Sequence, residues 1–554
     1  MNIKYQYNYV KSLLKRYGFK GLVLKTAERS HSPMLSYTDV YRRYLPDEEE
    51  LDRQRQDVFT FAPLVSIVIP AYETGERYLR ELLDSLAAQT YENWELCLAD
   101  GSRSSSVESV VKEYQNKEKR IHYKRLTKNG GISENTNAGF EMAAGAFVAL
   151  MDHDDVLAPN ALYEMVKCLN EYPYDKRNLA MIYSDEDKID SEGKVHSRPH
   201  FKPDFNLEFL RRNNYFCHFL MFSRELLEKT GGLDPEFDGA QDYDFVLRCV
   251  EAGAYVGHVP KILYHWRIHE GSTAGNSADK EYAFDNGCKA IEGHLRRMGT
   301  TGRARVTPNL GVYQVSYELK GIYKVSVAAA SKETLAYIKK QITPYLTGED
   351  YKIKAEYLLA DRLEKEILNR AKGDYIFWVK EHVTIPKDAL VKLLSICAAG
   401  QNGIVGAKVI DTKKRVLSNG YIYDSKGHLI PSLKGLYGGF KGYFLHGVIP
   451  KWVSAVSFDC VVIKGKAFQM AEEDLRFTGE YYGADLSFSM RKAGFFTVVS
   501  PEVSVILKAG AKGEFNQTER EIFCRKWVKE LLRPDPCYNR NLKLKTGHTY
   551  EMRD

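Results

Sequence analysis

Three aspartates and a histidine stand together at residues 152–155, directly after an apolar run that ends at Met151. Carboxylates crowded at the end of a strand repel one another unless a neighbouring charge neutralises them. Mg²⁺ and Mn²⁺ prefer oxygen ligands and commonly bridge carboxylates to substrate phosphates. The cluster therefore predicts a divalent cation site and phosphate chemistry. The alternative is a solvated acidic turn that caps the next helix.

The elements around this cluster alternate between strands and helices from residue 63 onward. We expect strands at 65–69, 94–99, 121–126, 147–151 and near 181, and helices at 78–89, 107–116, 133–143 and 161–170. Regular alternation predicts an α/β fold with a Rossmann-like, mainly parallel sheet and helices on both faces. Ligands of such sheets bind at the carboxyl ends of the strands. Polar residues that directly follow these strands are therefore candidate site residues.

Several of these positions, taken in order, resemble family-2 glycosyltransferases of the GT-A fold. The matching segments are residues 65–72, 99–102, 129–132 and 152–154, and the resemblance extends over residues 63 to about 300. It implies that Tyr72 stacks on the nucleotide base, that Asp100 hydrogen-bonds that base, and that Asp152 and Asp154 form a D-x-D that holds ribose and metal. The donor-binding set implied in this way is Pro70, Tyr72, Asp100, Asn129, Gly131, Asp152 and Arg267.

Two later segments resemble the rest of the family's active site. In residues 239–244, Asp242 would be the general base that deprotonates the acceptor hydroxyl, which implies inversion at the anomeric carbon. On this segment alone, a helix N-cap is the alternative for Asp242. In residues 264–272, Arg267 would neutralise the donor diphosphate and His269 would bind the metal with Asp154.

A further set of polar residues follows the pattern of surface-polysaccharide members of the same family. These side chains are expected to contact the sugar or the acceptor, with a solvated loop as the alternative. They are Asp185, Asp187, Lys202, Asp204 and Gln241.

The second half of the chain weakly repeats the first. Residues 372–379 align with 144–151, and residues 325–327 align with 65–67. In this alignment Lys380 replaces Asp152, Gly483 replaces Asp242 and Gly510 replaces His269. A lysine at the metal position would repel a cation. We therefore expect a degenerate GT-A-like α/β copy that serves structure, acceptor recognition or oligomerisation.

The sequence thus predicts four parts. Residues 1–62 form a basic amphipathic helical segment with its apolar face on Val10, Leu13, Leu14 and Tyr17, followed by an acidic linker at 47–52. Such a helix can lie on an anionic membrane surface or pack on its own protein. Residues 63–300 form the catalytic domain, 301–515 the degenerate domain, and 516–554 a C-terminal helical tail.

The bulk composition excludes several other classes of protein. The net charge of +6 is too dilute to indicate a nucleic-acid partner, and the nine cysteines show no C-x-x-C pair. No apolar run approaches the roughly 20 residues of a membrane helix. We expect a cytoplasmic protein, with a peripheral position on the inner face of the plasma membrane and homo-oligomer formation both open.

The function that these observations favour is metal-dependent transfer of a sugar, hexosyl or deoxyhexosyl, from a nucleotide-diphosphate sugar. The acceptor would be a glycan, carried on a lipid, in bacterial cell-surface polysaccharide biosynthesis. Two alternatives stay open. One is a protein or teichoic-acid glycosyltransferase with the same site, and the other is a non-catalytic sugar-binding scaffold. Which nucleotide sugar is used, and whether Mg²⁺ or Mn²⁺ is preferred, does not follow from these motifs.

Overall fold

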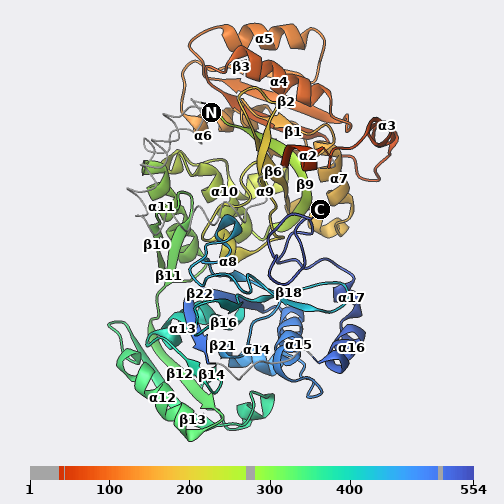
Figure 1. The fold of residues 1–554 in the computed structure, drawn as a ribbon. Helices are drawn as coiled ribbons and strands as arrows, with labels where there is room; N and C mark the ends of the chain where they lie inside the picture. The colour runs from red at the N-terminus through yellow and green to blue at the C-terminus, as the bar shows by residue number, and fades with distance from the viewer. Residues whose placement is uncertain (1–36, 43, 270–280, 509–515, 554) are drawn as a thin grey trace, which may run out of the picture.

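The computed structural model describes residues 37–42, 44–269, 281–508 and 516–553. It contains two large β-sheets, one in the upper and one in the lower half of Figure 1, each surrounded by helices. The amphipathic helix expected around residues 10–17 lies outside the described residues. Within the ranges given above, none of the helices combines the length and the apolar character that a membrane span requires.

The first sheet has nine strands in the order β3-β2-β1-β4-β8-β6-β9-β5, with β7 paired to β6. They are β1 (Val65–Ala71), β2 (Trp94–Asp100), β3 (Ile121–Arg125), β4 (Phe147–Leu150), β5 (Val156–Leu157), β6 (Ala180–Ile189), β7 (His196–His200), β8 (Leu220–Ser223) and β9 (Tyr255–Arg267). Strands β1 to β4 pair in parallel, and so do β6 and β9. The α/β class is therefore confirmed. The strand β8, antiparallel to β4 and β6, is absent from the sequence-based expectation.

Helices cover both faces of this sheet because its central strands are apolar on both sides. Every residue of β2 is buried, as expected for a strand sandwiched between two layers. One face packs on α4 (Glu76–Ala87), α5 (Ser106–Gln115) and α7 (Ala161–Asn170). The other packs on α6 (Ile132–Met142), α9 (Arg224–Thr230) and α10 (Gln241–Glu251).

The acidic segment at residues 47–52 is not a linker, which corrects the sequence-based expectation. It is the N-terminal part of α3 (Glu48–Gln56), whose first turn is capped by the Asp47 carboxylate accepting from the Glu50 N–H at 2.9 Å. Acidic side chains in a first turn are favoured by the helix dipole. The acidic run is therefore a helix start, preceded by the short α2 (Tyr37–Tyr41).

The second sheet also has nine strands, in the order β13-β12-β14-β21-β16-β22-β15, with β17 paired to β16 and β20 to β22. They are β12 (Gly321–Ala329), β13 (Tyr351–Leu359), β14 (Tyr375–Val379), β15 (Val383–Thr384), β16 (Asn402–Asp411), β17 (Val416–Ser418), β20 (Lys451–Trp452), β21 (Cys460–Lys464) and β22 (Phe496–Leu507). Its helices are α12 (Lys332–Ile342), α13 (Ala389–Ala398), α14 (Gly465–Met470) and α15 (Gly479–Lys492).

The two sheets share one topology, strand for strand, except that β3 of the first sheet and β20 of the second have no counterpart. Val65 pairs with Phe147 in the first sheet, and Val325 pairs with Tyr375 in the second. Both sheets insert an antiparallel strand, β8 or β21, at the same place. The expected second α/β domain of GT-A-like form is therefore confirmed.

The duplication extends to a buried polar contact. In the first sheet Ser66 Oγ donates to Glu95 at 2.5 Å and accepts the Gly145 N–H at 2.8 Å. In the second, Ser326 Oγ donates to Glu356 at 2.5 Å and accepts the Gly373 N–H at 2.9 Å. The same pair of serine hydrogen bonds fixes the turn before β4 and the turn before β14.

The two units are joined by shared packing rather than by a bare linker. The hairpin β10 (Gly302–Val306) and β11 (Tyr313–Tyr317) lies between them with α8 (Leu207–Leu210) and α11 (Glu281–Arg297). A single apolar cluster runs from Phe209 of α8 through Tyr317 of β11 to Leu394 of α13. The predicted boundary at residue 300 stays a prediction.

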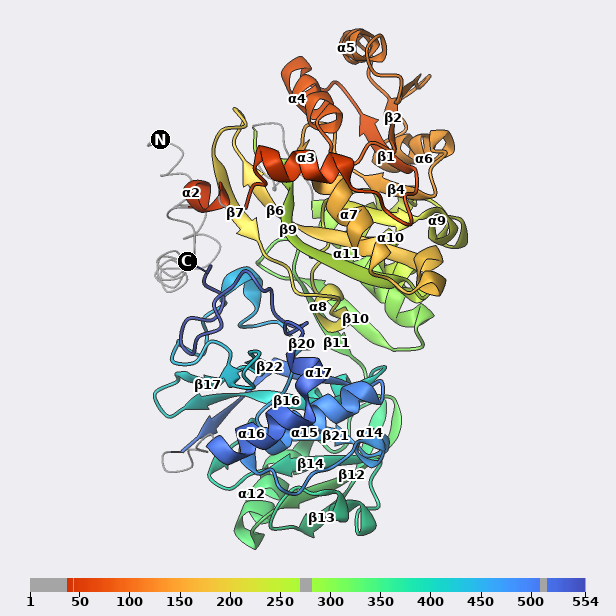
Figure 2. The same cartoon turned by 90° about the vertical axis from the view of Figure 1, so that its right-hand side faces the viewer.

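The C-terminal segment starts on the second unit and ends beside the first (Figure 2). Helices α16 (Gln517–Lys526) and α17 (Val528–Leu531) begin it, and residues 532–553 continue without a helix. A small hairpin of β18 (Tyr421–Tyr423) and β19 (Leu429–Pro431) lies beside this segment, since the Tyr423 N–H donates to Asp535 at 2.9 Å. The predicted helical tail is thus helical only in its first half.

Candidate active site

The acidic cluster follows β4 and divides into one buried and two accessible carboxylates. Asp155 is fully buried, accepts the Arg267 N–H at 2.7 Å and is also hydrogen-bonded by the Tyr264 hydroxyl. Its burial, together with the charges of Asp152 and Asp154, raises the pKa of Asp155 well above its ordinary value. The side chains of Asp152 and Asp154 are 41% and 19% exposed. Asp155 therefore anchors the turn, and the other two face the open edge of the sheet.

His269 lies against the accessible part of this cluster. Its Nε2 is 2.7 Å from Asp154 Oδ2, and its ring packs 5.1 Å from the ring of Tyr78. The expected pairing of Asp154 with His269 is therefore present in the geometry, while their role in binding metal stays a prediction.

Arg267 has a different environment from the one expected of a diphosphate ligand. It is fully buried, its Nε donates to the Asp154 carbonyl at 2.8 Å, and its guanidinium lies 2.6 Å from Glu81. Its charge also lies 4.8 Å above the ring of Tyr78. In this conformation Arg267 holds the D-x-D turn in place, and its guanidinium is paired inside the protein.

The residues expected to bind the nucleotide meet at the carboxyl ends of β1, β2 and β3. Asp100 is fully buried and accepts from the Ser102 N–H at 2.8 Å and the Tyr123 hydroxyl at 2.7 Å. Tyr72, by contrast, is 39% exposed. Pro70 is half-buried in the last part of β1, opposite Ala99.

The loop that carries Asn129 and Gly131 packs directly on the loop after β2. A Cβ on Gly101 would lie 3.2 Å from Asn129 Oδ1, and the same oxygen accepts the Gly131 N–H at 3.1 Å. Gly131 has a φ of 93°, and a Cβ there would meet the Asp238 carboxylate at 2.8 Å. Glycine is thus required here both by the backbone conformation and by the close approach.

Asp242 faces the same edge from the opposite side. It is the second residue of α10, whose N-cap is Ala240, so the alternative of a helix N-cap is wrong. Its Oδ2 accepts from Asn214 Nδ2 at 2.8 Å. Burial raises the pKa of Asp242, although the charge of His218 acts in the other direction. Its neighbour Gln241 turns back to accept the Gly239 N–H at 2.7 Å.

His218 is a site residue that the sequence motifs miss. Its Nδ1 is 3.7 Å from Asp152 Oδ2, and its ring stacks 5.3 Å from the ring of Tyr264 and meets the ring of Trp266 edge-on at 4.8 Å. It therefore lies between the D-x-D and Asp242. Cys217 before it has a φ of 46°, an uncommon value for a residue with a side chain. Only the pairing of β8 with β4, which is not evident in the sequence, brings His218 to this place.

Four of the second set of predicted contacts lie away from the open edge. Asp185, Asp187 and Lys202 are fully buried, and Asp204 is bonded to His258 at 2.9 Å. Lys202 Nζ donates to Glu186 at 2.9 Å and to two carbonyls. These groups are bonded to other protein groups, and their predicted role in contacting sugar stays untested.

Asp187 belongs to a second cluster of metal-ligand side chains. In the described part of the chain, Asp187, His196 and His265 are a group whose donor atoms all lie within 4.8 Å of one another. Tyr37 donates to Asp187 at 2.9 Å, and the Tyr41 hydroxyl is 2.8 Å from His265 Nε2. The group is thus covered by α2 and engaged in hydrogen bonds.

The second unit carries different chemistry at the equivalent positions. From the strand pairing, Lys380 corresponds to Asp152 and Asp459 corresponds to His218. Lys380 Nζ lies 3.6 Å from Asp459. A basic side chain therefore stands in the place of Asp152, and an acidic side chain stands in the place of His218. Gly483 stands in place of Asp242 on α15. The counterpart of His269, Gly510, lies outside the described residues.

Comparisons with known proteins show what this chain resembles. Residues 66–231 match the model of the family described as glycosyl transferase family 2. The uncharacterized protein y4gI of Sinorhizobium fredii (strain NBRC 101917 / NGR234) is 30% identical over 554 residues, covering 89% of this chain and 59% of that protein. The O-antigen biosynthesis protein RfbC of Myxococcus xanthus is 36% identical over 291 residues, covering 52% and 22%. The chain thus spans less than two thirds of the length of either relative.

Among the solved structures, one similar to part of this chain is that of S. aureus TarS 1–349 in complex with UDP-GlcNAc. It is 20% identical, with a TM-score of 0.35, and covers 42% of this chain and 66% of that chain.

Proposed function

We propose that this chain, which carries a family 2 glycosyltransferase domain, transfers a sugar from a nucleotide-diphosphate donor to a glycan acceptor with inversion. The observation that carries the proposal is one edge of one sheet. At this edge, three carboxylates and an aromatic ring face a common space from different strands and helices. They are the accessible Asp152 and Asp154, the half-buried Asp242 and the exposed Tyr72.

The nucleotide half of the site would lie over β1 to β3. The exposed ring of Tyr72 offers a stacking surface, and the close loops at Gly101 and Gly131 allow backbone to approach the donor. Asp100 is held by Ser102 and Tyr123 in one orientation. A carboxylate fixed in this way can accept a hydrogen bond from a nucleotide base, while the exposed ring beside it stacks on the face of the same base.

Asp152, Asp154 and His269 would hold the divalent cation. Oxygen and imidazole donors fit Mn²⁺ or Mg²⁺. The charges of Asp152 and Asp154 add to burial in raising the pKa of Asp155, and a cation would relieve the part of the shift that those charges cause. When bound, the cation stabilises the charge of the departing nucleoside diphosphate. We favour this set over Asp187, His196 and His265, because Asp187 and His265 are hydrogen-bonded to Tyr37 and Tyr41 of α2.

Asp242 would act as the general base. Its carboxylate takes the proton of the acceptor hydroxyl, the hydroxyl oxygen attacks the anomeric carbon, and the bond from that carbon to the diphosphate oxygen breaks. A raised pKa brings a carboxylate closer to the working pH of a base. The Asn214 amide orients this carboxylate, and His218 lies between it and Asp152.

The context would be synthesis of a cell-surface polysaccharide. The similarity to an O-antigen biosynthesis protein supports this proposal, as does the similarity to the chondroitin synthase of Pasteurella multocida, which is 32% identical over 244 residues. A lipid-linked acceptor at a membrane surface is the finer form of the proposal.

The test is a thermal-shift panel of UDP-, dTDP- and GDP-sugars with and without Mn²⁺. We expect one donor to stabilise the wild type in a metal-dependent way, and Asp154→Ala to lose that response. Asp242→Asn should keep the response to donor and lose about 10² to 10⁴ in transfer rate. Lys380→Ala, at the equivalent position of the second unit, is the matched control and should change neither. No response to any donor would refute the proposal.

A further inference from the structure

The C-terminal segment around residues 535–539 bridges the two α/β units. Asn539 Nδ2 donates to Asp185 at 2.8 Å and to the Lys202 carbonyl at 2.7 Å, both in the first unit. Asp535 accepts from Ser454 at 2.7 Å in the second unit. Buried hydrogen bonds therefore fix this segment to both α/β units, so that it forms a wall between them.

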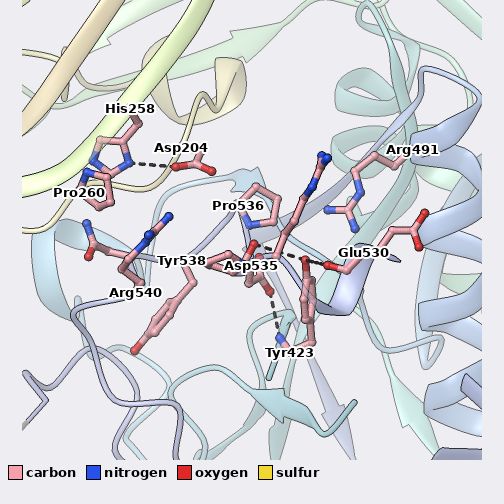
Figure 3. A pocket seen from close by; sticks show the side chains of 13 residues that line it. Asp204, His258, Pro260, Tyr423, Arg491, Glu530, Asp535, Pro536, Tyr538 and Arg540 are labelled. Carbon is pink, nitrogen blue, oxygen red and sulfur yellow. Dashed lines mark hydrogen bonds and ion pairs between the residues drawn. The ribbon is translucent and has the colours of Figure 1, made fainter. Parts of the chain in front are cut away.

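A cavity of about 410 Å³ opens beside this wall (Figure 3). That volume lies in the range of sites that hold a small ligand or part of a larger one. Its lining comes from β9, β18, α15, α17 and the C-terminal segment: Asp204, His258, Pro260, Tyr423, Arg491, Glu530, Arg533, Pro534, Asp535, Pro536, Tyr538, Asn539 and Arg540. It is separate from the edge that carries Asp152 and Asp242, which do not line it.

Three arginines on this lining lack an acidic partner. Neither Arg491, Arg533 nor Arg540 forms an ion pair with any residue that the structure describes. Figure 3 shows Arg491 and Arg540 on opposite sides of the cavity. Arg491 is half-buried, with its charge 4.7 Å above the ring of Phe488. Guanidinium groups gathered at a cavity without carboxylates in contact favour an anion.

The acids on the same lining are already engaged elsewhere. Asp204 is 2.9 Å from His258 Nδ1, and Glu530 is 3.1 Å from Lys492. Asp535 is buried and accepts hydrogen bonds from Ser454 Oγ and from the Tyr423 and Cys537 N–H groups. None of the three therefore forms an ion pair with these arginines, although the charge of Arg491 acts on Asp535 from beyond ion-pair distance.

We propose that this cavity binds a phosphate- or diphosphate-bearing sugar, the anionic part of the acceptor, outside the catalytic edge. The arginines would hold the phosphate oxygens, and the rings of Tyr423 and Tyr538 with the flanking prolines would contact the sugar. The identification with the acceptor rests on the proposed transferase function. The anion site itself does not.

Isothermal titration calorimetry of the full chain with pyrophosphate and with N-acetylglucosamine 1-phosphate tests the site. We expect both to bind, and neutral N-acetylglucosamine not to. Arg491→Gln and Arg540→Gln should each weaken binding about tenfold, the loss expected for one charged hydrogen-bonding group. Arg305→Gln, an exposed arginine of β10, is the matched control. Arg491→Lys keeps the charge and should lose less than Arg491→Gln.

Asp154→Ala separates this proposal from the transferase function. We expect it to lose metal-dependent donor binding and to keep pyrophosphate binding in the cavity. Absence of pyrophosphate binding, or binding that Arg491→Gln and Arg540→Gln leave unchanged while the variants stay folded, would overturn the proposal. Loss of pyrophosphate binding in Asp154→Ala would place the anion at the catalytic edge and would overturn it as well.

Discussion

Glu208 offers a direct test of how the two units are held together. It is 1% exposed and lies at the junction, where Arg212 donates to it at 2.6 Å and Arg211 at 3.3 Å. The Tyr317 hydroxyl and Asn402 Nδ2, the latter from the second unit, each contact it at 2.9 Å. Glu208→Gln keeps the shape of the side chain and removes its charge.

The expected cost follows from the two arginines left behind. Arg211 and Arg212 are 3% and 1% exposed, so the variant leaves two buried positive charges without this carboxylate. Breaking a buried ion pair by removing one partner costs about 3–5 kcal/mol. For a unit of 150–250 residues, each 1 kcal/mol shifts the melting temperature by about 2–4 °C. We therefore expect a fall of roughly 6–20 °C.

The assay is urea and thermal unfolding followed by tryptophan fluorescence. Glu228→Gln, on an exposed helical glutamate without a described partner, is the control and should change stability by less than about 0.5 kcal/mol. Adding Arg212→Met to Glu208→Gln should recover part of the loss, because one orphaned charge is removed. A loss below about 1 kcal/mol, or a double variant less stable than the single, would refute the reasoning.

The same residue gives a dependence on pH. Burial alone would raise the pKa of Glu208, but the charges of Arg212 and Arg211 outweigh it and the pKa is lowered. A lowered carboxyl pKa contributes stability above the unfolded value, near 4.3, and that contribution is lost as the pH falls through the folded value. The difference between wild type and Glu208→Gln should therefore be complete at pH 7 and shrink below about pH 4.

Three further predictions concern other parts of the molecule. Gly145→Ala and Gly373→Ala should each destabilise by about 1–3 kcal/mol in urea unfolding, because each new Cβ would lie 2.7 Å from a serine Oγ and close to backbone. Burial lowers the pKa of Lys451 to about 7, so the unfolded chain binds the extra proton between that pH and about 10. Lys451 should therefore add about 2 kcal/mol of stability from pH 7 to pH 9, and Lys451→Met should remove that part and leave the part from Lys408, whose pKa burial lowers to about 8. In Mn²⁺ titrations with UDP, followed by electron paramagnetic resonance, Asp154→Ala should weaken metal binding at least tenfold and Asp187→Asn should not; the reverse result would place the cation at the buried cluster.

The sequence predicts the strands well where they are apolar on both faces. Short, continuous apolar runs such as residues 65–69 and 147–151 are stable as strands at the centre of a sheet that helices cover on both faces. They form β1 and β4. The acidic run at 47–52 is misread because charge alone does not distinguish a linker from a capped helix start. The short β8 is missed because its four residues carry no periodicity, and its place depends on partners distant in the chain.

The site shows a similar division. A motif after β4 points to Asp152 and Asp154, because topology brings strand ends to one edge, and a motif at the start of α10 points to Asp242. Motifs do not tell which polar groups are exposed. Asp155 and Arg267 are buried and bonded to one another, a distinction set by side-chain direction rather than by residue type. His218 has no motif at all, and its position depends on the unpredicted antiparallel strand.

The comparison of the two units shows which side chains differ between the proposed cation site and its counterpart. In the first unit, Asp152 presents an accessible carboxylate 3.7 Å from the imidazole of His218. At the same places, Lys380 beside Asp459 forms an ion pair that is complete by itself. The ammonium occupies the position of the D-x-D carboxylate and pairs with Asp459, and its positive charge would repel Mn²⁺. The second unit therefore keeps the topology of the first, with a lysine in place of the cation that we propose for the catalytic edge.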